Sequence, residues 1–388
     1  MIADYRALFG EVLRCRDVQL FHRTAYGGEA IHPRSALYAR AAARSFFLSP
    51  AWIGAWLSGK PEGVELFVLR GIIGGETYLL GLFGRSVRRS PPVIGSRALH
   101  LNEFGVSSFD TVYIEYNDLL LSASTPETAR NEALKALFEY FSSEDDLLFR
   151  NVRSELVEAI ESANEGRRVL HVLNRQPTFA VDLEAARGGD DALSTLSSSA
   201  RSQIRRSIRR YEERGELKFK IAEGETAREE VWKKLSELHL AGWRSRGVSG
   251  AFGAPAFEAF HKHLRDHSPE CVHLIEISAG DETIGCLYNF AYEDRALNYQ
   301  SGFRFEEDNQ LKPGFVAHAL AIRHYAEAGL SVYDLLAGDA PYKRRLANEG
   351  ESFSSLVLER RDGARALARH AARRLKSALT PAAGTRQT

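Results

Sequence analysis

Apolar and polar residues alternate with two different periods along this chain. In the first half, a period of two predicts strands, and apolar residues three or four positions apart predict helices. The elements expected there are strands at 64–70, 77–83 and 111–116, helices at 126–141 and 152–163, strands at 169–172 and 178–183, a basic loop at 85–89 and a break at Pro177.

The second half shows a more regular order of elements. It is expected to contain a helix at 193–211, a strand at 217–222, helices at 227–245 and 256–265, strands at 272–278, 283–292 and 296–303, a helix at 313–328, and strands at 332–335 and 353–358. Short turns join the three central strands, which predicts an antiparallel meander. This order predicts a mixed α/β fold with a mainly antiparallel sheet and flanking helices.

The periodic pattern lapses at 187–191, a run of Arg-Gly-Gly-Asp-Asp, and we expect a domain boundary there. A chain of 388 residues is long enough for two domains. We therefore predict an N-terminal unit at 1–186, a C-terminal unit at 187–360 and a basic, flexible tail at 361–388. The small apolar stripe of the tail fits either a frayed, solvated helix or a membrane-surface anchor.

Charge and cysteine content narrow the functional classes. The chain has 51 Lys and Arg against 51 Asp and Glu, so no net field directs it to nucleic acid or to an anionic membrane. Its three cysteines form no C-x-x-C pair, which argues against a zinc knuckle and suits a reducing compartment. No uninterrupted apolar run reaches about 18 residues, so no transmembrane segment is expected. We therefore expect a cytoplasmic protein without a metal.

Residues 298–343 contain the most informative candidate site. A strand and a loop lead to a helix that begins at Pro313 and Gly314. The first turn of a helix presents unpaired backbone N–H groups and the positive end of the helix dipole, which suits a pyrophosphate. Pro-Gly alone is equally compatible with an ordinary helix start.

Two further segments carry basic or aromatic side chains on helices. Arg201 and Arg205 lie one turn apart, so their side of the helix fits either phosphate binding or a solvated face paired with nearby glutamates. His239 and Trp243 share one edge of the next helix. A histidine there suits a general base, because its pKa lies near neutrality, or a structural role at the boundary of the core.

A fourth set of candidates follows a short buried strand. Asp334 ends that strand, where a carboxylate needs a partner, and Tyr342 and Lys343 follow eight and nine residues later. This set fits either proton transfer and oxyanion stabilisation or a structural salt bridge between these same residues. The sequence contains no G-x-S-x-G, Walker A, dinucleotide-binding or H-E-x-x-H motif.

Together, these motifs resemble the CelD-like acetyltransferase domain of the GNAT superfamily, which is related to the FemAB peptidyltransferases. The resemblance spans about 191–358. The segments that carry it are Arg201-x-x-Ile204-Arg205-Arg206, His239-x-x-x-Trp243, Tyr299-Gln300-Ser301-Gly302-Phe303, Pro313-Gly314 and Tyr333-Asp334-x-x-x-Gly338-x-x-x-Tyr342-Lys343.

The resemblance implies tandem GNAT-like acyl-CoA N-acyltransferase units and direct attack of an acceptor on an acyl-CoA thioester. Such proteins are often tied to cellulose or exopolysaccharide production. The cofactor-binding residues implied are Lys312, Pro313, Gly314, Phe315 and Val316, and the substrate-binding residues are Arg201, Arg205, Trp243 and Arg244. The chain departs from the family pattern in one place, since the usual Q/R-x-x-G-x-G/A loop is absent and the acidic run 306–308 stands there instead.

The sequence therefore predicts acyl transfer from acyl-CoA to an amine or sugar-linked acceptor, with no metal or nucleic acid. His239 or Asp334 is the expected base, Tyr299 or Tyr342 the proton donor to the leaving thiolate, and Lys343 the support for the oxyanion. The alternatives are a FemAB-like aminoacyltransferase that uses aminoacyl-tRNA, and a non-catalytic GNAT-shaped scaffold of a polysaccharide synthesis complex.

Overall fold

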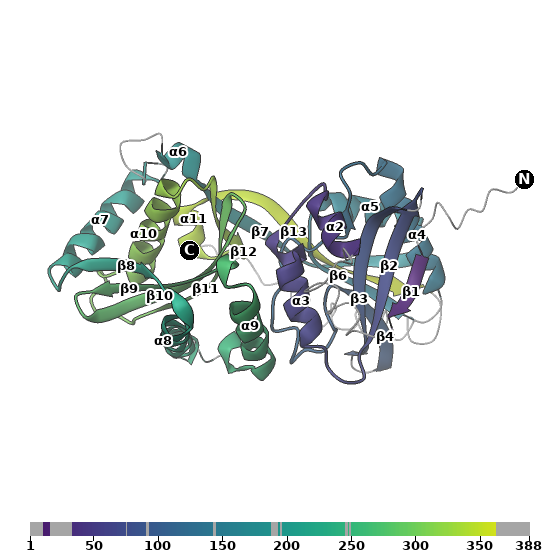
Figure 1. Cartoon of the computed structure of the whole chain (residues 1–388), viewed down its shortest axis with the longest axis horizontal. Coiled ribbons are helices and arrows are strands. Elements are labelled where there is room, and N and C mark those ends of the chain that lie inside the picture. Colours follow the sequence, from purple (N-terminus) through teal and green to yellow (C-terminus); the bar gives the residue numbers. More distant parts are fainter. Residues whose placement is uncertain are drawn as a thin grey trace, which may run out of the picture.

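A single mixed sheet runs through the whole protein. The computed structural model describes strand β1 (Glu11–Cys15) and residues 33–361, except 75, 91–92, 143–144, 188–192, 195, 245–246 and 248–249. The described strands follow the order β1-β2-β3-β4-β6-β13-β7-β12-β11-β10-β9-β8, with β5 paired to β3. Figure 1 shows two lobes with helices around this sheet, joined in the middle by β7 and β13.

Residues 33–187, called the N-terminal half below, form one lobe. Their elements are α2 (Pro33–Ala39), η2 (Phe46–Leu48), α3 (Pro50–Ser58), β2 (Glu65–Ile73), β3 (Glu76–Ser90), β4 (Val93–Leu101), β5 (Leu120–Leu121), α4 (Glu127–Tyr140), β6 (Asp145–Val152), α5 (Ser154–Asn164), β7 (Arg168–Asp182) and α6 (Leu183–Arg187).

Residues 193–361, called the C-terminal half below, form the other lobe. Their elements are α7 (Ser198–Glu212), β8 (Leu217–Ile221), α8 (Gly224–Arg244), η3 (Ala251–Gly253), α9 (Pro255–His267), η4 (Pro269–Cys271), β9 (Val272–Ala279), β10 (Glu282–Tyr292), β11 (Arg295–Phe303), α10 (Pro313–Glu327), β12 (Val332–Ala337), α11 (Pro341–Leu346) and β13 (Asn348–Arg360).

Both halves repeat one order of elements. A three-strand antiparallel meander is followed by a helix, a strand parallel to the last meander strand, a second helix and a long final strand. The parallel pairs are β4 with β6 and β11 with β12. The mixed α/β fold with a mainly antiparallel sheet is therefore confirmed. The divisions at 186/187 and 360/361 stay predictions, because one sheet crosses the first of them.

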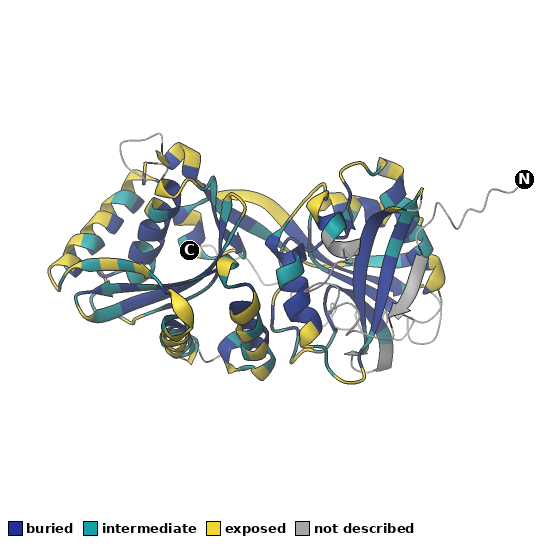
Figure 2. Cartoon of the chain, in the orientation of Figure 1, coloured by how far each residue is buried: buried dark blue, intermediate teal, exposed yellow. Residues whose placement is uncertain are grey.

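The two long final strands are exchanged between the halves. Strand β13 lies between β6 and β7, and β7 in turn pairs with β12. Leu356 and Leu358 of β13 belong to the apolar core of the N-terminal half, and Phe179 and Val181 of β7 belong to the core of the C-terminal half. Buried residues run without interruption from Phe353 to Glu359, which indicates a strand covered on both faces (Figure 2).

A third apolar cluster joins the halves beside the exchanged strands. Trp52 of α3 packs its ring 4.7 Å from Phe260 of α9 and 5.6 Å from Tyr299 of β11. Phe46 stacks on Phe290 of β10 with ring centroids 4.3 Å apart. Such aromatic pairs each add about 0.5–1.5 kcal/mol beyond the area they bury, so the halves share one core.

Three local predictions were wrong, each for a physical reason. Residues 85–89 are not a loop but continue β3, because Arg85 pairs across the sheet with Glu65 at 3.1 Å. Strand β7 is not broken at Pro177, since the pairing shifts register on both sides of this residue and accommodates it. Residues 111–116 are an irregular segment and not a strand.

The segment 111–116 nevertheless keeps the alternation that suggested a strand. Val112, Ile114 and Tyr116 are buried, as the pattern predicts. The backbone makes side-chain hydrogen bonds in place of a ladder, since the Asn151 amide donates to the Ile114 carbonyl at 2.9 Å. Tyr116 has φ 48°, a left-handed conformation that ends the extended run.

No described helix is long and apolar enough to cross a membrane. The tail at 362–388, for which the sequence suggested a solvated helix or membrane-surface contact, lies outside the described residues.

The exchanged strands lead to a stability prediction. Leu356→Ala removes a fully buried side chain from the core of the opposite half and should lower the free energy of unfolding by about 2–5 kcal/mol. Urea unfolding followed by tryptophan fluorescence should show one cooperative transition at lower urea. Val172→Ala, on an exposed part of β7, is the control and should change stability by less than about 0.5 kcal/mol. Two separate transitions, with the N-terminal half unaffected, would contradict the shared core.

Candidate functional site

The parallel strands β11 and β12 separate after three residue pairs and open a cleft. They pair at Arg295 with Val332, Ala296 with Tyr333 and Leu297 with Asp334, and no further. A bulge follows at once, because Asn298 pairs with Asn289 and Gln300 with Tyr288, which leaves Tyr299 as the extra residue. A cleft of about 790 Å³ lies where the strands diverge. The separated edge of β11 offers backbone N–H and C=O groups to a ligand.

The N-terminus of α10 forms one wall of this cleft. Lys312, Pro313, Gly314 and Phe315 line it, whereas Val316 is fully buried in the apolar core. The N–H groups of Gly314 and Phe315 have no acceptor within the helix. A Cβ on Gly314 would lie 3.1 Å from the Phe303 ring, so glycine leaves room for this ring against the start of the helix. The wall therefore fits an anionic group such as a pyrophosphate.

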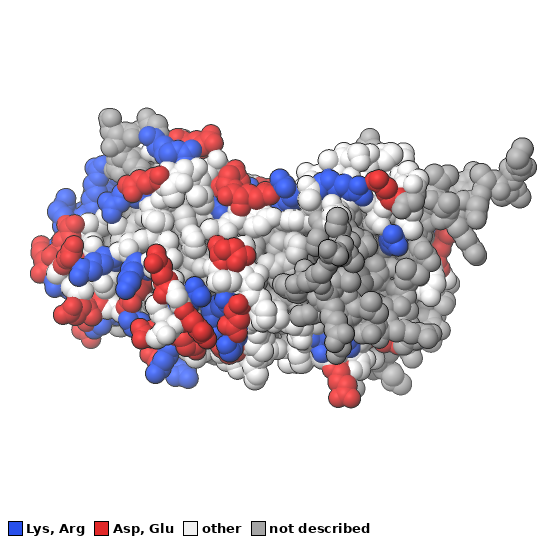
Figure 3. Space-filling model, viewed as in Figure 1, with Lys and Arg blue, Asp and Glu red and all other residues white. Residues whose placement is uncertain are grey.

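Two acids of the run beside this wall are paired with arginines of α7 and of the turn after it. Arg210 pairs with Asp308 at 2.7 Å. Arg214 contacts both carboxylate oxygens of Glu306 at 3.2 Å, and Tyr211 donates a hydrogen bond to the same carboxylate. Figure 3 shows the resulting mixture of basic and acidic side chains over the C-terminal half, on the left. The charges of these two acids are therefore compensated by Arg210 of α7 and by Arg214 just beyond its end.

Three of the arginines predicted to bind substrate lie outside the cleft lining. Arg201 donates to the carbonyls of Ser194 and Leu196, and Arg205 and Arg244 are exposed on α7 and α8. Trp243, the fourth predicted residue, does line the cleft. The basic side of α7 therefore fits the alternative of a solvated face paired with acids. The acids are those at 306 and 308 and not the glutamates nearby in the chain.

His239 of α8 lies where the cleft meets a second cavity. Its Nδ1 donates to the Ser301 carbonyl at 3.1 Å, and in the neutral ring this leaves the lone pair on Nε2. A Cβ on Gly250 would lie 2.9 Å from Nε2, so this glycine leaves room for the imidazole. His239, Trp243 and Gln300 line both hollows.

The second cavity, of about 380 Å³, is lined by aromatic, small and amide side chains. Thr111 and Tyr113 reach it from the N-terminal half, opposite Trp243. Tyr299 donates its hydroxyl to the Tyr113 carbonyl at 3.2 Å and so ties this segment to β11. No carboxylate or ammonium group is part of the lining that the structure describes. Such a cavity suits an uncharged group that bears hydroxyls.

Tyr342 and Lys343 of α11 also line the cleft, together with His318 of α10. Tyr342 stacks on His318 with centroids 5.6 Å apart, and burial raises the pKa of Tyr342 to about 12. Burial, together with the charge of Lys343, lowers the pKa of His318 to about 3, so His318 is neutral. Lys343 Nζ donates to the carbonyls of Ala337 at 2.6 Å and Leu336 at 3.3 Å.

Glu115 of the N-terminal half also lines this cleft, and sequence reasoning missed it. Its Oε2 accepts the backbone N–H of Ala337 at 2.7 Å. Burial raises its pKa to about 7, although the Ala337 hydrogen bond and Lys343 act in the opposite direction. The sequence around Glu115, which predicts a strand, does not indicate that this carboxylate lies in the cleft, because its partners are more than 200 residues away in the chain.

Asp334 has a structural environment and is not part of the cleft lining. It is fully buried, and its Oδ2 accepts from Tyr116 at 2.5 Å and from Arg295 at 2.9 Å. Its Oδ1 accepts the N–H of Leu336 at 2.8 Å, which supports the left-handed conformation of that residue at φ 63°. Both oxygens are therefore engaged in a structural network, but the ion-pair partner of Asp334 is Arg295 and not Lys343, as the sequence alternative supposed.

The corresponding gap in the N-terminal half is bridged by the protein itself. Strands β4 and β6 pair from Arg97 to His100 and then separate. Asn117 lies beyond this point, and its Nδ2 donates to the carbonyls of Leu101 at 3.1 Å and Arg150 at 3.0 Å. Asn102 adds a hydrogen bond to Asn117 at 2.8 Å. The segment that bridges this gap also carries Glu115 into the cleft of the other half and Tyr113 into the second cavity.

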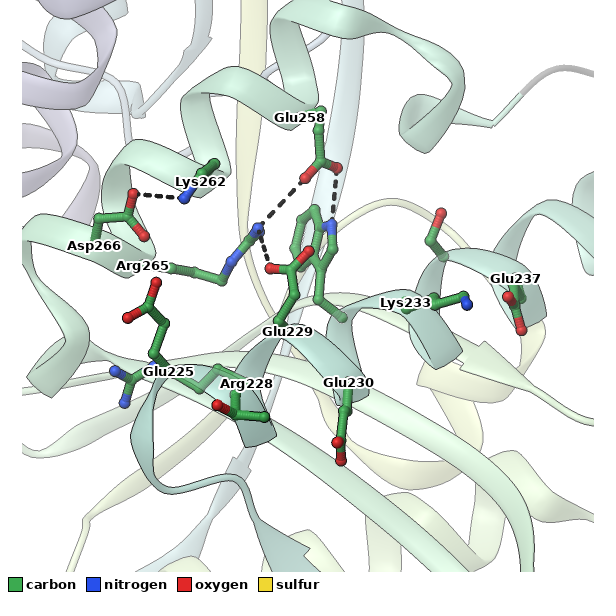
Figure 4. A pocket seen from close by; sticks show the side chains of 13 residues that line it. Glu225, Arg228, Glu229, Glu230, Lys233, Glu237, Glu258, Lys262, Arg265 and Asp266 are labelled. Carbon is green, nitrogen blue, oxygen red and sulfur yellow. Dashed lines mark hydrogen bonds and ion pairs between the residues drawn. The ribbon is translucent and has the colours of Figure 1, made fainter.

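A larger groove of about 1110 Å³ lies between α8 and α9, away from this cleft. Figure 4 shows Arg265 at its centre, bonded to Glu229 and Glu258. The guanidinium lies 3.8 Å from the Trp232 ring, and Trp232 donates to Glu258 at 2.8 Å. These contacts hold the two helices together. No group of three or more possible metal ligands occurs among the residues that the structure describes.

Comparison with known proteins supports a GNAT fold. Residues 198–344, less than half of the chain, match the model described as "Acetyltransferase (GNAT) domain". The matched region includes the cleft walls β11, β12 and the N-terminus of α10. The sequence has no match among curated proteins.

Several solved structures share the fold at low sequence identity. FemX aligns with a TM-score of 0.54 and 10% identity, over 89% of this chain and 96% of that one. The C-terminal domain of a putative lysylphosphatidylglycerol synthetase from Agrobacterium fabrum aligns with a TM-score of 0.51 and 12% identity, over 92% and 97%. The protein thus has the fold of an acyltransferase, and its particular reaction rests on its own residues.

Asp334→Asn tests the structural role of that residue. The amide keeps the shape of the side chain but loses the negative charge that accepts hydrogen bonds from the Tyr116 hydroxyl and the Arg295 guanidinium. The free energy of unfolding should therefore fall by about 3 kcal/mol. Thermal unfolding measures this loss. The exposed variant Asp339→Asn serves as the control and should change little. Unchanged stability of Asp334→Asn together with abolished activity would instead favour Asp334 as a catalytic base.

Proposed function

We propose that this protein is an acyltransferase that moves an acetyl or longer acyl group from coenzyme A to an amine or sugar-linked acceptor. One observation carries the proposal: two cavities, one beside a helix N-terminus and one without charged side chains, meet at His239. A donor in the first and an acceptor in the second would bring their reacting atoms together at a histidine.

The larger cleft suits the donor. The N-terminus of α10 would hold the pyrophosphate through the N–H groups of Gly314 and Phe315, with Lys312 beside them. The edge of β11 from 298 to 303 would receive the pantetheine arm. The acyl thioester supplies the activated carbonyl, and no covalent intermediate on the enzyme is required.

His239 is the proposed proton acceptor. The acceptor nucleophile attacks the thioester carbonyl carbon, a C–N or C–O bond forms, and the C–S bond breaks. His239 Nε2 takes the proton of the nucleophile. Tyr342 is the proposed proton donor to the leaving thiolate, and Lys343 supports the oxyanion through its charge. The Tyr299 hydroxyl donates a hydrogen bond to the Tyr113 carbonyl and would hold Tyr113 in place in the wall of the acceptor cavity.

The smaller cavity suits an uncharged, hydroxyl-bearing acceptor. Tyr113 and Trp243 offer ring faces, and Gln300 and Thr111 offer hydrogen bonds. A sugar ring presents both apolar and hydroxyl faces and matches this combination. The resemblance of the motifs to CelD-like proteins further supports a role in polysaccharide biosynthesis.

Binding of acyl-CoA tests the donor site. Titration calorimetry with acetyl-CoA and longer acyl-CoAs should show one site per chain. Gly314→Glu should weaken binding at least about 100-fold, because its side chain meets Phe303 and its charge opposes the phosphates. Gly59→Glu makes the same change at the end of α3, where only ordinary contacts are near, and should bind normally. Absence of binding by every coenzyme A ester would overturn the proposal and favour an aminoacyl-tRNA or carrier-protein donor, or a scaffold.

Substitution of His239 tests the proton acceptor. His239→Gln should lower kcat about 100- to 10,000-fold at unchanged donor affinity, since general base catalysis typically contributes that much. A thiol-release assay measures the rate, and calorimetry measures the affinity. His267→Ala, at the exposed end of α9, should have no effect. A kcat within threefold of the wild type would exclude His239 as the base.

A further inference from the structure

Two side chains from opposite halves of the protein bind one residue of the cleft wall. Glu115 Oε2 accepts the N–H of Ala337 at 2.7 Å, and Lys343 Nζ donates to the carbonyl of the same residue at 2.6 Å. Ala337 ends β12, next to Leu336 with its φ of 63°. The end of the wall strand is therefore held from both sides by a carboxylate and an ammonium group.

The two side chains are also electrostatic partners. Lys343 is only 8% exposed, and burial alone favours the neutral amine. The negative charges of Glu115 and Asp334 act against this loss of charge. Asp334 is already shared between Arg295 and Tyr116, so its charge is largely compensated. Glu115 is thus the carboxylate left to balance Lys343.

We propose that Glu115 is a positioning residue of the active site, which keeps Lys343 charged and fixed on the cleft wall during acyl transfer. This inference rests on the proposed function, in which Lys343 supports the oxyanion. In this arrangement both halves contribute to the site, since α11 supplies the cation Lys343 and the irregular segment 111–116 of the N-terminal half supplies its counter-charge, Glu115.

The pH dependence follows from the groups that surround the pair. Those facing Glu115 are Lys343, Asp334, Tyr299 and Tyr342, and His318 also faces Lys343. Since the pKa of Glu115 is raised to about 7, its carboxylate forms as the pH rises through that value. The pKa of Lys343 is lowered by burial, so its charge is lost on the alkaline side. The competent pair exists between these two limits.

Glu115→Gln separates charge from geometry. The amide oxygen still accepts the Ala337 N–H, but the counter-charge is gone. The pKa of Lys343 should then fall by about 1–3 units, the usual effect of one nearby opposite charge. NMR titration of protein labelled with ¹³C at lysine Cε measures this value, with the Lys343 signal assigned by its loss in Lys343→Arg. Glu349→Gln, an exposed glutamate paired with Arg344, should leave the value unchanged.

The titration needs no substrate, so it tests the pair even if no acyl-CoA binds. In the transfer assay, the alkaline limb should move to lower pH in Glu115→Gln by the same amount as the Lys343 titration, whereas the acidic limb set by His239 should remain. Glu115→Ala should also weaken donor binding, because the end of β12 is released. A Lys343 pKa that stays the same or rises in Glu115→Gln would overturn the inference, and so would an unchanged pH profile of transfer.

Discussion

The exchange of two long strands between the halves is the constraint on which the rest of this structure depends. Strand β13 fills the position between β6 and β7, and β7 forms the support for β12. Because β12 is one wall of the cleft, the strand that holds this wall belongs to the other half of the chain. Neither half has a complete sheet alone, and the buried side chains of each exchanged strand fill the core of its opposite half. The position of this cleft wall therefore depends on the sheet that both halves build together.

The two halves have the same order of elements, and in each a gap forms where the parallel strands separate, but only one of the two gaps stays open. Parallel strands that separate leave a gap with free backbone groups, and such groups need partners. In the N-terminal half the Asn117 amide, held by a hydrogen bond from Asn102, donates to carbonyls of both strands and closes the gap. In the C-terminal half the gap stays open beside the N-terminus of α10. The segment that closes the first gap extends to the second, which explains how Glu115 comes to lie in a cleft formed by the C-terminal half.

Burial and charge are matched at Asp334, Lys343 and Glu115. Asp334 satisfies both oxygens with three donors and anchors the turn at Leu336. Lys343 is bound to backbone carbonyls, and Glu115 lies on the other side of the same residue. The low identity to FemX and to the other solved structures supports the fold only, so these local arrangements, and not the likeness, carry the argument for acyl transfer.

The sequence by itself determined the regular elements of the C-terminal half, the three-strand meander and the helix start at Pro313, because these depend on local periodicity and turn residues. It also drew attention to His239, Trp243, Tyr342 and Lys343, which do line the cleft. It failed at the irregular segment 111–116, whose alternation of buried residues imitates a strand. Only the tertiary structure decided that β7 and β13 are exchanged, that Asp334 is an anchor, and that Glu115 faces Lys343. The physical reason is that these relations join residues far apart in the chain, and local periodicity records burial but not the partner that causes it.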